Sequence, residues 1–320
     1  MKMKKQKIFL IGILIIFSSL LTYYFSPTNA IAQSLGLGIY PPLLEVTIMP
    51  GKSITQVYKL TNSGEIDLMM TSAMYAFEPS DETGGVKLIS DTQSLQPIFF
   101  DFLNANLKLG QTFPLPAGET QEVVLIIKVP ETATEKDYYA TLLFQTNPMA
   151  SLGGLSTSQT QTKIGGNLLL TVSRTGEPFK KAIIEEFRLS NCSQFCFIDS
   201  FTPPQFLLKI KNAGHSYFKP FGKITLKGWL KQEESLDLLP QNILSDSTRE
   251  IQCQIDDQVA PCQTKSKFLI GPIRAKVEFG LDDLSSQYHQ EFRFIALPIK
   301  LTMALFALTI ILWLIKMRME

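Results

Sequence analysis

The stretch Val123-Val124-Leu125-Ile126-Ile127-Lys128-Val129-Pro130 decides the fold class. Apolar residues occupy every second position from Val123, which is the spacing of side chains along one face of a β-strand. Val124 and Ile126 make the opposite face apolar as well. This pattern is typical of a sandwich strand that is buried on both faces, or covered by a loop on one of them.

The same two-residue spacing recurs on the C-terminal side of this stretch. Two further alternating rows are Ala140, Leu142, Phe144 and Leu168, Leu170, Val172. Turn-forming groups such as Asn62-Ser63-Gly64 and Pro116-Ala117-Gly118 separate the apolar segments along the chain. With one exception, no segment between residues 38 and 293 keeps an apolar period of 3.6 residues. The sequence therefore predicts an all-β chain.

The exception is the Phe-rich segment Pro97–Leu109, which fits either a short helix or an irregular strand. Its apolar residues are Phe99, Phe100, Phe102, Leu103 and Leu107. The three Phe side chains favour a place in the core, and the alternative is a recognition patch.

A polar segment, Arg174–Lys181, separates the last strand of one unit from new alternation at Ile183. It contains Gly176 and Pro178 and is predicted to be a linker. We therefore expect two β-sandwich domains in tandem. The first, over residues 37–175, is immunoglobulin-like, and the second, over 180–293, is immunoglobulin-like or fibronectin-III-like.

An internal echo supports two related units. Tyr58–Gly64 reads Tyr-Lys-Leu-Thr-Asn-Ser-Gly, and Leu208–Gly214 reads Leu-Lys-Ile-Lys-Asn-Ala-Gly. In both, a strand runs into an Asn-small-Gly turn. We expect the glycine to adopt a positive φ angle where the chain reverses.

The N-terminal segment has the layout of a secretory signal peptide over residues 1–32. Four lysines precede the apolar run Ile8–Phe25, and the small-residue step Ala30-Ile31-Ala32 follows Ser26-Pro27. This order favours cleavage after Ala32. Because the apolar run is longer than a typical signal core, an uncleaved anchor is the alternative.

The C-terminal segment is predicted to be a transmembrane helix over residues 297–316, followed by a cytoplasmic tail over 317–320. Lys300 near the outer end can extend to the headgroups, and Trp313 lies near the inner boundary. Lys316 and Arg318 follow on the cytoplasmic side. We expect a single-pass, type I protein of the cell membrane with an extracellular ectodomain.

The charge and cysteine content restrict the partners and the compartment. With 30 basic and 29 acidic residues, the chain gives no electrostatic reason to expect nucleic acid as a partner. The cysteines are Cys192, Cys196, Cys253 and Cys262. In an exported chain they predict two disulfides, for which three pairings are open, and a zinc site is the alternative.

The residues give little support for catalysis, a metal or a cofactor. The only histidines, His215 and His289, lie in polar surroundings, and no nucleophile elbow, phosphate-binding glycine loop or zincin motif occurs. The acidic pairs Asp81-Glu82 and Asp282-Asp283 are typical of solvated turns, with calcium as the alternative. We expect a protein without enzymatic activity and without a cofactor.

The polar tract Ser151–Lys163 lies between two predicted strands and is too long for a tight hairpin. It is either a flexible hairpin end or a loop that contacts a partner, because binding residues often sit on loops carried by a rigid sheet. The candidate contact residues are Ser151, Gly153, Gly154, Ser156, Thr157 and Gln159.

Three motifs near the start of the first predicted domain suggest a family. They are Gly38-Ile39-Tyr40-Pro41-Pro42, Pro50-Gly51-Lys52-Ser53 and Tyr58-Lys59-Leu60-Thr61-Asn62. Together with the order of signal peptide, two domains, helix and basic tail, they resemble the bacterial WxL-interacting protein family. The resemblance implies a bridge between the membrane and cell-wall peptidoglycan, WxL-domain proteins or host matrix. The four cysteines are a departure from that family.

The leading hypothesis is a non-enzymatic, membrane-anchored surface adaptor that binds a cell-wall polymer or another exported protein. A sheet edge of the first domain would accept a partner strand. The second hypothesis is an accessory subunit of a membrane-embedded secretion or pilus-type complex, in which Lys300 pairs with an acidic residue of a neighbouring helix. An enzyme with an unfamiliar site is a third.

Overall fold

The computed structural model describes residues 36–147, 161–190, 192, 196–229, 232–266, 268–282 and 287–319. The predicted signal peptide lies outside these residues. So do Asp283 and the six candidate residues of the polar loop, from Ser151 to Gln159.

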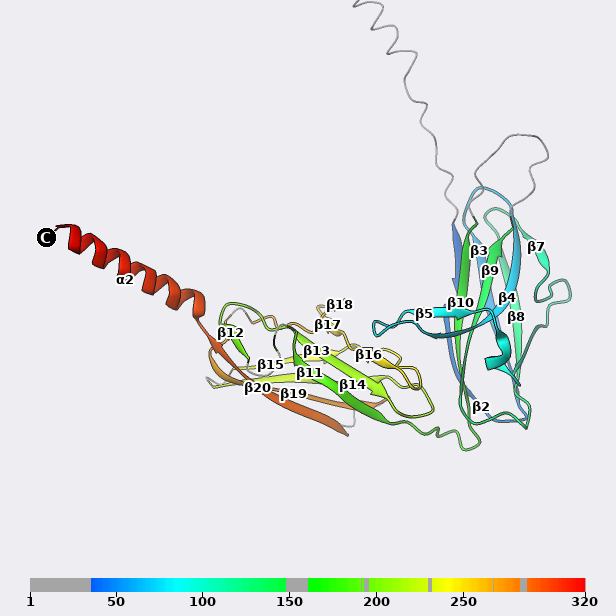
Figure 1. The fold of residues 1–320 in the computed structure, drawn as a ribbon. Helices are drawn as coiled ribbons and strands as arrows, with labels where there is room; N and C mark the ends of the chain where they lie inside the picture. Colours follow the sequence, from blue (N-terminus) through cyan, green and yellow to red (C-terminus); the bar gives the residue numbers. More distant parts are fainter. Residues whose placement is uncertain are drawn as a thin grey trace, which may run out of the picture.

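The first domain is a sandwich of two sheets (Figure 1). The first sheet has the strand order β1 (Leu37–Tyr40), β3 (Ser53–Asn62), β8 (Thr120–Lys128) and β6 (Phe99–Phe102). The second has the order β2 (Leu43–Ile48), β10 (Lys163–Val172), β9 (Asp137–Thr146), β4 (Leu68–Pro79) and β5 (Val86–Ile89), and β7 (Thr112–Leu115) also pairs with β4. A short 3₁₀ helix, η1 (Thr92–Leu95), precedes β6.

The N-terminal strand of this domain serves both sheets. β1 pairs antiparallel with β3, and β2 pairs parallel with β10. The chain changes sheets at Tyr40-Pro41, a cis peptide bond, because the proline has no backbone N–H to continue either ladder. One lateral edge of the sandwich is thereby closed.

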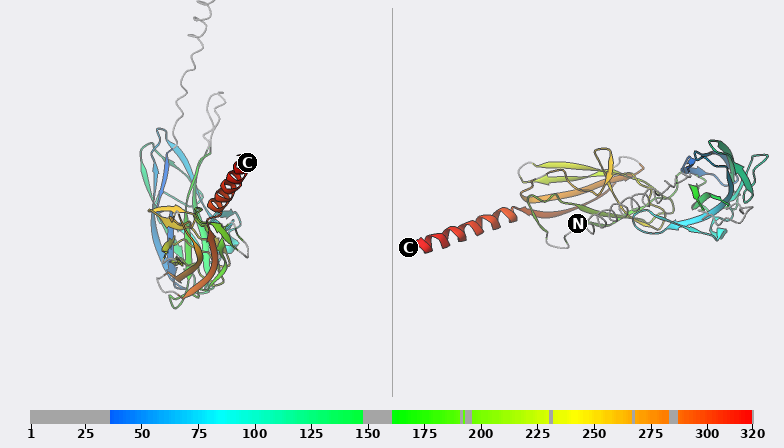
Figure 2. Two further views of the ribbon diagram at one scale, coloured as in Figure 1. Left: turned by 90° about the vertical axis from the view of Figure 1, so that its left-hand side faces the viewer. Right: turned by 90° about the horizontal axis from the view of Figure 1, so that it is seen from above.

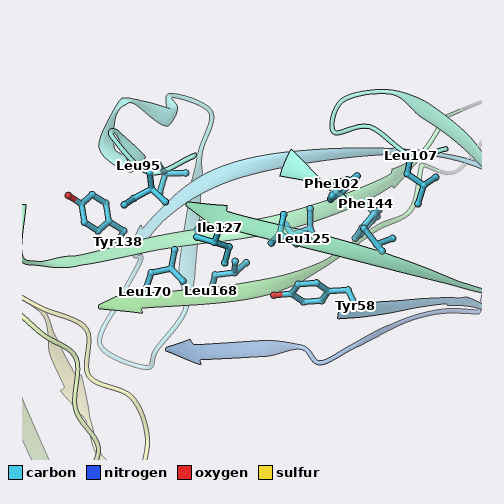
Figure 3. Close-up of a cluster of buried hydrophobic side chains, with 14 of the residues drawn as sticks. Tyr58, Leu95, Phe102, Leu107, Leu125, Ile127, Tyr138, Phe144, Leu168 and Leu170 are labelled. Carbon is cyan, nitrogen blue, oxygen red and sulfur yellow. The ribbon is translucent and has the colours of Figure 1, made fainter. Parts of the chain in front are cut away.

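The predicted fold-deciding stretch forms β8, which lies between β3 and β6. Its inward side chains Val123, Leu125 and Ile127 are fully buried, whereas Val124 and Ile126 on the other face are half-buried. Figure 3 shows Leu125 and Ile127 in one cluster with β9 and β10 residues such as Phe144, Leu168 and Leu170. Full burial of each such aliphatic side chain contributes about 1.5–3 kcal/mol.

The second domain is also a sandwich of two sheets. The smaller sheet has the order β11 (Ala182–Leu189), β13 (Phe206–Asn212) and β16 (Thr248–Glu250). The larger has the order β12 (Phe197–Asp199), β20 (Tyr288–Leu297), β19 (Gly271–Leu281), β14 (Pro220–Gly228), β15 (Glu233–Leu238), β17 (Cys253–Ile255) and β18 (Gln258–Ala260). In its core Phe187 stacks on Phe206, and the partly buried Phe292 packs edge-on against Phe187.

Two disulfides lie in this domain. One joins Cys192 to Cys196, and the other joins Cys253 to Cys262 next to the hairpin of β17 and β18. Of the three pairings open from the sequence, the structure contains the one with the shortest loops. Closing short loops stabilises less than closing long ones, about 2–3 kcal/mol for a loop of roughly ten residues.

The C-terminal helix α2 (Ile299–Met319) projects from the far end of the second domain (Figures 1 and 2). Its segment Ile299–Arg318 has a mean hydropathy of 2.0 and is entirely exposed. At 1.5 Å per residue, 20 residues reach about 30 Å, which is the thickness of the hydrocarbon core. The helix is therefore long and apolar enough to cross a bilayer.

The prediction of an all-β chain with two tandem sandwiches and one C-terminal helix is confirmed. The Phe-rich segment resolves in favour of a strand, because Phe99–Phe102 forms β6. The exact domain limits, 37–175 and 180–293, stay a prediction.

The internal echo corresponds to a repeated buried asparagine. Asn62 is fully buried, and its side-chain amide donates to the carbonyls of Ile66, Leu115 and Pro116 at 2.8–3.2 Å. Its Oδ1 accepts from the Gly64 N–H at 3.0 Å. One side chain thus satisfies backbone groups of two separate loops.

Asn212 repeats this arrangement in the second domain. Its amide donates to the carbonyls of Ser216 and Ile243, and its Oδ1 accepts from the Gly214 N–H. The expected positive φ is wrong for both turns, since neither Gly64 nor Gly214 has one. Gly214 is required by close packing, because a Cβ there would lie 2.7 Å from the Lys181 backbone nitrogen.

We expect Asn62→Ala and Asn212→Ala each to lower the free energy of unfolding by roughly 2–4 kcal/mol, because buried carbonyls lose their donors. Denaturant unfolding of the purified chain measures this. Asn106→Ala, at an exposed position in the loop after β6, is the control and should cost less than about 1 kcal/mol. An effect of Asn62→Ala no larger than this control would contradict the structural role.

Candidate functional site: a groove in the first domain and the domain junction

A groove opens between the two sheets of the first domain, on the side opposite β1 and β2. It has a volume of about 660 Å³, and its lining includes Ser72, Met74, Leu95, Pro97, Phe99 and Phe100. None of its twelve lining residues is charged. The volume lies within the range of ligand-binding clefts.

The floor of the groove is the inward face of β4. Along that face Leu68, Met70, Met74 and Ala76 are apolar, and Ser72 interrupts the row. Ser72 is fully buried, and its hydroxyl has no hydrogen-bond partner. The small side chain leaves space in the row, and its hydroxyl is itself enclosed by the surrounding residues.

One wall is the edge strand β6, which pairs with β8 alone. The Leu103 N–H donates to the Val124 carbonyl, so the backbone groups of Phe99, Asp101 and Leu103 face β8. Those of Phe100 and Phe102 face outward. Asp101 Oδ1 occupies the Phe102 N–H at 2.8 Å, which leaves the Phe100 N–H and carbonyl open to a partner strand.

Opposite β6, the groove is bordered by residues 72–75 of β4, which have no neighbouring strand on their outer edge among the described residues. β7 pairs with residues 68–71 and β5 with residues 76–79. Asn147 N–H donates to the Met69 carbonyl, so the backbone groups of Ser72 and Met74 face away from β9 and toward this outer edge. The Ser72 carbonyl accepts from the Gly110 N–H. The outward backbone groups of Met74 have no neighbouring strand in the described part of the chain, and Met74 lines the groove.

The predicted Phe cluster divides between the core and this groove. Phe102 is buried, whereas Phe99 is 53% exposed with Lys128 Nζ 5.6 Å from its ring centroid. The sequence reading missed Ser72. The available signal was a polar residue in the inward row of an otherwise apolar strand.

The second structured region is the junction between the domains. Phe77 and Leu169 of the first domain pack with Leu244 of the second, next to Tyr139 and Tyr217. The Tyr139 hydroxyl accepts from the Ser245 N–H at 2.9 Å and donates to Asp137 Oδ2 at 2.7 Å. The junction therefore has its own small apolar core with hydrogen bonds around it.

Asp137 is the buried carboxylate of the junction. Besides Tyr139 it accepts from the Thr171 hydroxyl at 2.7 Å and from the Tyr217 N–H of the second domain at 2.6 Å. Burial raises the pKa of Asp137, while these donors act in the opposite direction. Every contact satisfies an acceptor, so Asp137 serves as a fixed structural link.

Ion pairs with one consistent polarity cross the junction. Glu45 accepts from Lys219 Nζ at 2.7 Å and from the Asn242 side-chain amide, and Glu82 pairs with Lys209. In each case the first domain supplies the carboxylate and the second supplies the donor. This charge complementarity selects one relative placement of the two domains.

Arg249 completes the junction against the turn between β4 and β5. Its guanidinium donates to the carbonyls of Asn242 and Thr83, and burial lowers its pKa. Gly84 has φ +95°, and a Cβ there would lie 2.2 Å from Arg249 Cζ. The adjoining cavity of about 160 Å³ is therefore part of a packed interface.

The remaining candidate residues have structural contacts. His215 N–H donates to the Phe179 carbonyl of the linker, and His289 lies on β20 opposite Glu278. Asp81 bonds within its own turn, and Asp282 pairs with Lys180. Among the described residues, no group of three or more His, Cys, Asp or Glu side chains has the arrangement of a metal site.

The predicted anchor residues lie at both ends of α2. Lys300 pairs with Asp199 of the same chain, with Nζ 3.6 Å from Oδ2. The pairing of Lys300 with an acidic residue of a neighbouring helix stays a prediction. Trp313 is exposed on the helix, and Lys316 and Arg318 are in its last turn.

No protein-family model matches the chain, and no curated protein matches it. Among solved structures it is similar to the class 5 fimbriae chaperone CfaA, with 10% identity and a TM-score of 0.39 over 82% of this chain and 100% of CfaA. The E. coli chaperone DraB gives 13% identity and a TM-score of 0.38 over 82% and 99%. The SafB chaperone, in complex with the Salmonella enterica SafA pilin, gives 10% and 0.35 over 82% and 98%. At these low values the likenesses carry no argument about function.

We expect Glu45→Lys to lower the free energy of unfolding by about 1–2 kcal/mol and to separate the thermal unfolding of the domains into two transitions. The combined variant Glu45→Lys/Lys219→Glu should recover part of the loss. Differential scanning calorimetry checks both. The exposed pair Lys59–Glu122 is the control, and Lys59→Glu should change little. Equal effects at the two pairs would contradict a specific role for the junction.

The turn between β4 and β5 should respond to acid. Hydrogen bonds from the Thr83 hydroxyl and backbone, and from the Gly85 N–H, lower the pKa of Asp81 from 3.8 to about 2. Because the folded pKa is depressed, this contribution to stability is complete above pH 3.8 and is lost as the pH falls toward 2. We expect the Gly85 amide resonance to titrate near pH 2 in the wild type and to stay constant in Asp81→Asn. A midpoint at 3.8 in the wild type would refute it.

Proposed function

We propose that this chain is a non-enzymatic, membrane-anchored surface adaptor whose first domain binds an extended segment of another exported protein. The observation that carries the proposal is the uncharged groove between β6 and β4, with an open strand edge along one wall. The segment would add to β6 through the free N–H and carbonyl of Phe100 and place apolar side chains over Ser72.

The chemistry of the groove favours a polypeptide over a cell-wall polymer. A glycan is recognised through many hydroxyl groups, whereas this lining is mostly apolar and carries no charged side chain. An edge strand offers backbone donors and acceptors at the repeat of another strand. An extended neutral peptide matches both features, and its side chains on one face would be apolar.

Anchoring would come from α2, with the ectodomain outside a bacterial cell membrane. The signal peptide predicted over residues 1–32 and the basic residues after Trp313 support this orientation. The relation to WxL-interacting proteins, with peptidoglycan or WxL-domain proteins as partners, stays a proposal that rests on the short N-terminal motifs.

The test places a photo-crosslinking residue at Phe99 in the full chain, reconstituted in nanodiscs and mixed with the exported proteins of the source cells. We expect one extended segment, identified by mass spectrometry, with alternating apolar residues. A second crosslinker at Val57, exposed on the outer face of β3, is the positional control and should not label that segment. Equal labelling at both positions would contradict the groove.

Two substitutions of one residue give matched variants. Ser72→Leu fills the floor of the groove and should reduce crosslinking at Phe99 at least about tenfold, a loss of roughly 1.4 kcal/mol or more. Ser72→Ala removes only the unpaired hydroxyl and should retain crosslinking, with stability unchanged or increased by about 1 kcal/mol. Thermal unfolding verifies that Ser72→Leu is folded. Undiminished crosslinking in Ser72→Leu, or retention only on isolated wall polymer, would overturn the proposal.

A further inference from the structure

We infer that the end of the second domain next to α2 rests on the bilayer surface through an aromatic rim, formed by Phe197, Phe201, Trp229 and Phe268. This inference rests on the proposed membrane anchoring by α2. It adds a second contact with lipid, made by the β-sandwich itself.

The first step is the short connection between sheet and helix. β20 ends at Leu297 and α2 begins at Ile299, with Pro298 alone between them. Two residues of chain span at most about 7 Å. When α2 enters the bilayer, the last residues of β20 therefore lie at the level of the lipid headgroups.

The direction of the helix is also fixed. Asp199 at the end of β12 accepts the Lys300 N–H through Oδ1 at 3.0 Å, and its Oδ2 faces Lys300 Nζ at 3.6 Å. The Thr302 N–H closes the first helical turn on the Pro298 carbonyl. Figure 1 shows α2 leaving the domain beside β12 and continuing away from the sheets. The whole strand end is thus turned toward the membrane.

The strand registers place the four aromatic residues at this end. Phe197 pairs with Ile295 near the end of β20, and Gly271 pairs with Ala296. Trp229 follows β14 and packs on Gly271, where a Cβ would lie 3.1 Å from its Cε3. Phe201 and Phe268 contact each other with ring centroids 5.2 Å apart.

These four rings expose apolar surface to solvent, which is unfavourable in water. The exposed fractions are 72% for Trp229, 57% for Phe197, 48% for Phe201 and 43% for Phe268. Ile295 and Leu297 beside them are also exposed. Trp concentrates at the membrane interface, where its ring enters the apolar layer and its indole N–H stays hydrated, and exposed Phe rings at the same level can be buried in the acyl boundary. The bilayer is the occupant because α2 carries this surface to it.

The chain offers a direct test, because its two tryptophans are Trp229 and Trp313. Trp313→Phe leaves Trp229 as the reporter for the rim, and Trp229→Phe leaves Trp313 as the reporter for the helix. Each full-length variant is reconstituted in nanodiscs with phosphatidylcholine whose acyl chains are brominated near the headgroup. We expect emission at a short wavelength, and quenching of Trp229 by roughly half relative to unbrominated lipid.

The two reporters separate the inference from the proposed anchoring. Quenching of Trp313 with unquenched, water-like emission from Trp229 would overturn the rim contact and leave the anchor in place. Absence of quenching at both positions would overturn the anchoring as well. Protection of Trp229 in detergent that increases with protein concentration would show a second copy covering the rim, which also overturns the inference.

Two further variants test position. Val57→Trp, in a background without the other tryptophans, is the negative control on the first domain and should stay unquenched. Asp199→Ala removes the link between β12 and α2, and it should reduce quenching of Trp229 while leaving that of Trp313 unchanged. Equal quenching of Trp229 with and without Asp199 would show that the link does not set the contact.

Discussion

A buried asparagine side chain organises each sandwich. Asn62 and Asn212 stand at the ends of equivalent strands, where the backbone leaves the sheet and its carbonyls lose their ladder partners. Water cannot reach these groups, so an unpaired carbonyl would carry the full cost of desolvation. The amide nitrogen donates to two or three carbonyls and the amide oxygen accepts one N–H, which joins the turn to a loop distant in sequence. The packing of the hydrophobic core over that loop depends on these hydrogen bonds of the asparagine.

Polar pairing of the same kind continues between the domains, with charge added. The first domain presents Glu45, Glu82 and Asp137, and the second presents Lys209, Lys219 and the Tyr217 N–H. The apolar contact of Phe77 and Leu169 with Leu244 is small, so it alone would permit several relative placements of the two domains. The directional bonds select among them. Specificity here comes from polar geometry and the attraction comes from the small apolar core.

The sequence predicts the fold where the physics is local. Alternation around Val123, the turns, the polar linker and the apolar C-terminal run each depend on neighbours in the chain. The disulfide pairing and the crossing of the N-terminal strand at Pro41 depend on contacts between distant segments, so the sequence left them open. The groove eluded prediction for the same reason. Ser72 looks ordinary in the sequence, and its meaning appears only when η1 and β6 come to lie beside it.

The single residue between β20 and α2 has a mechanical consequence. A long flexible stalk would let the ectodomain sweep a wide volume above the membrane, with a low local concentration at any one height. Here Pro298 and the contacts of Asp199 with Lys300 hold the sandwich and the helix in one orientation. If α2 spans a membrane, as proposed, a force on the distal sandwich would tilt the helix instead of stretching a tether, and that tilt would change the height of the distal sandwich above the bilayer.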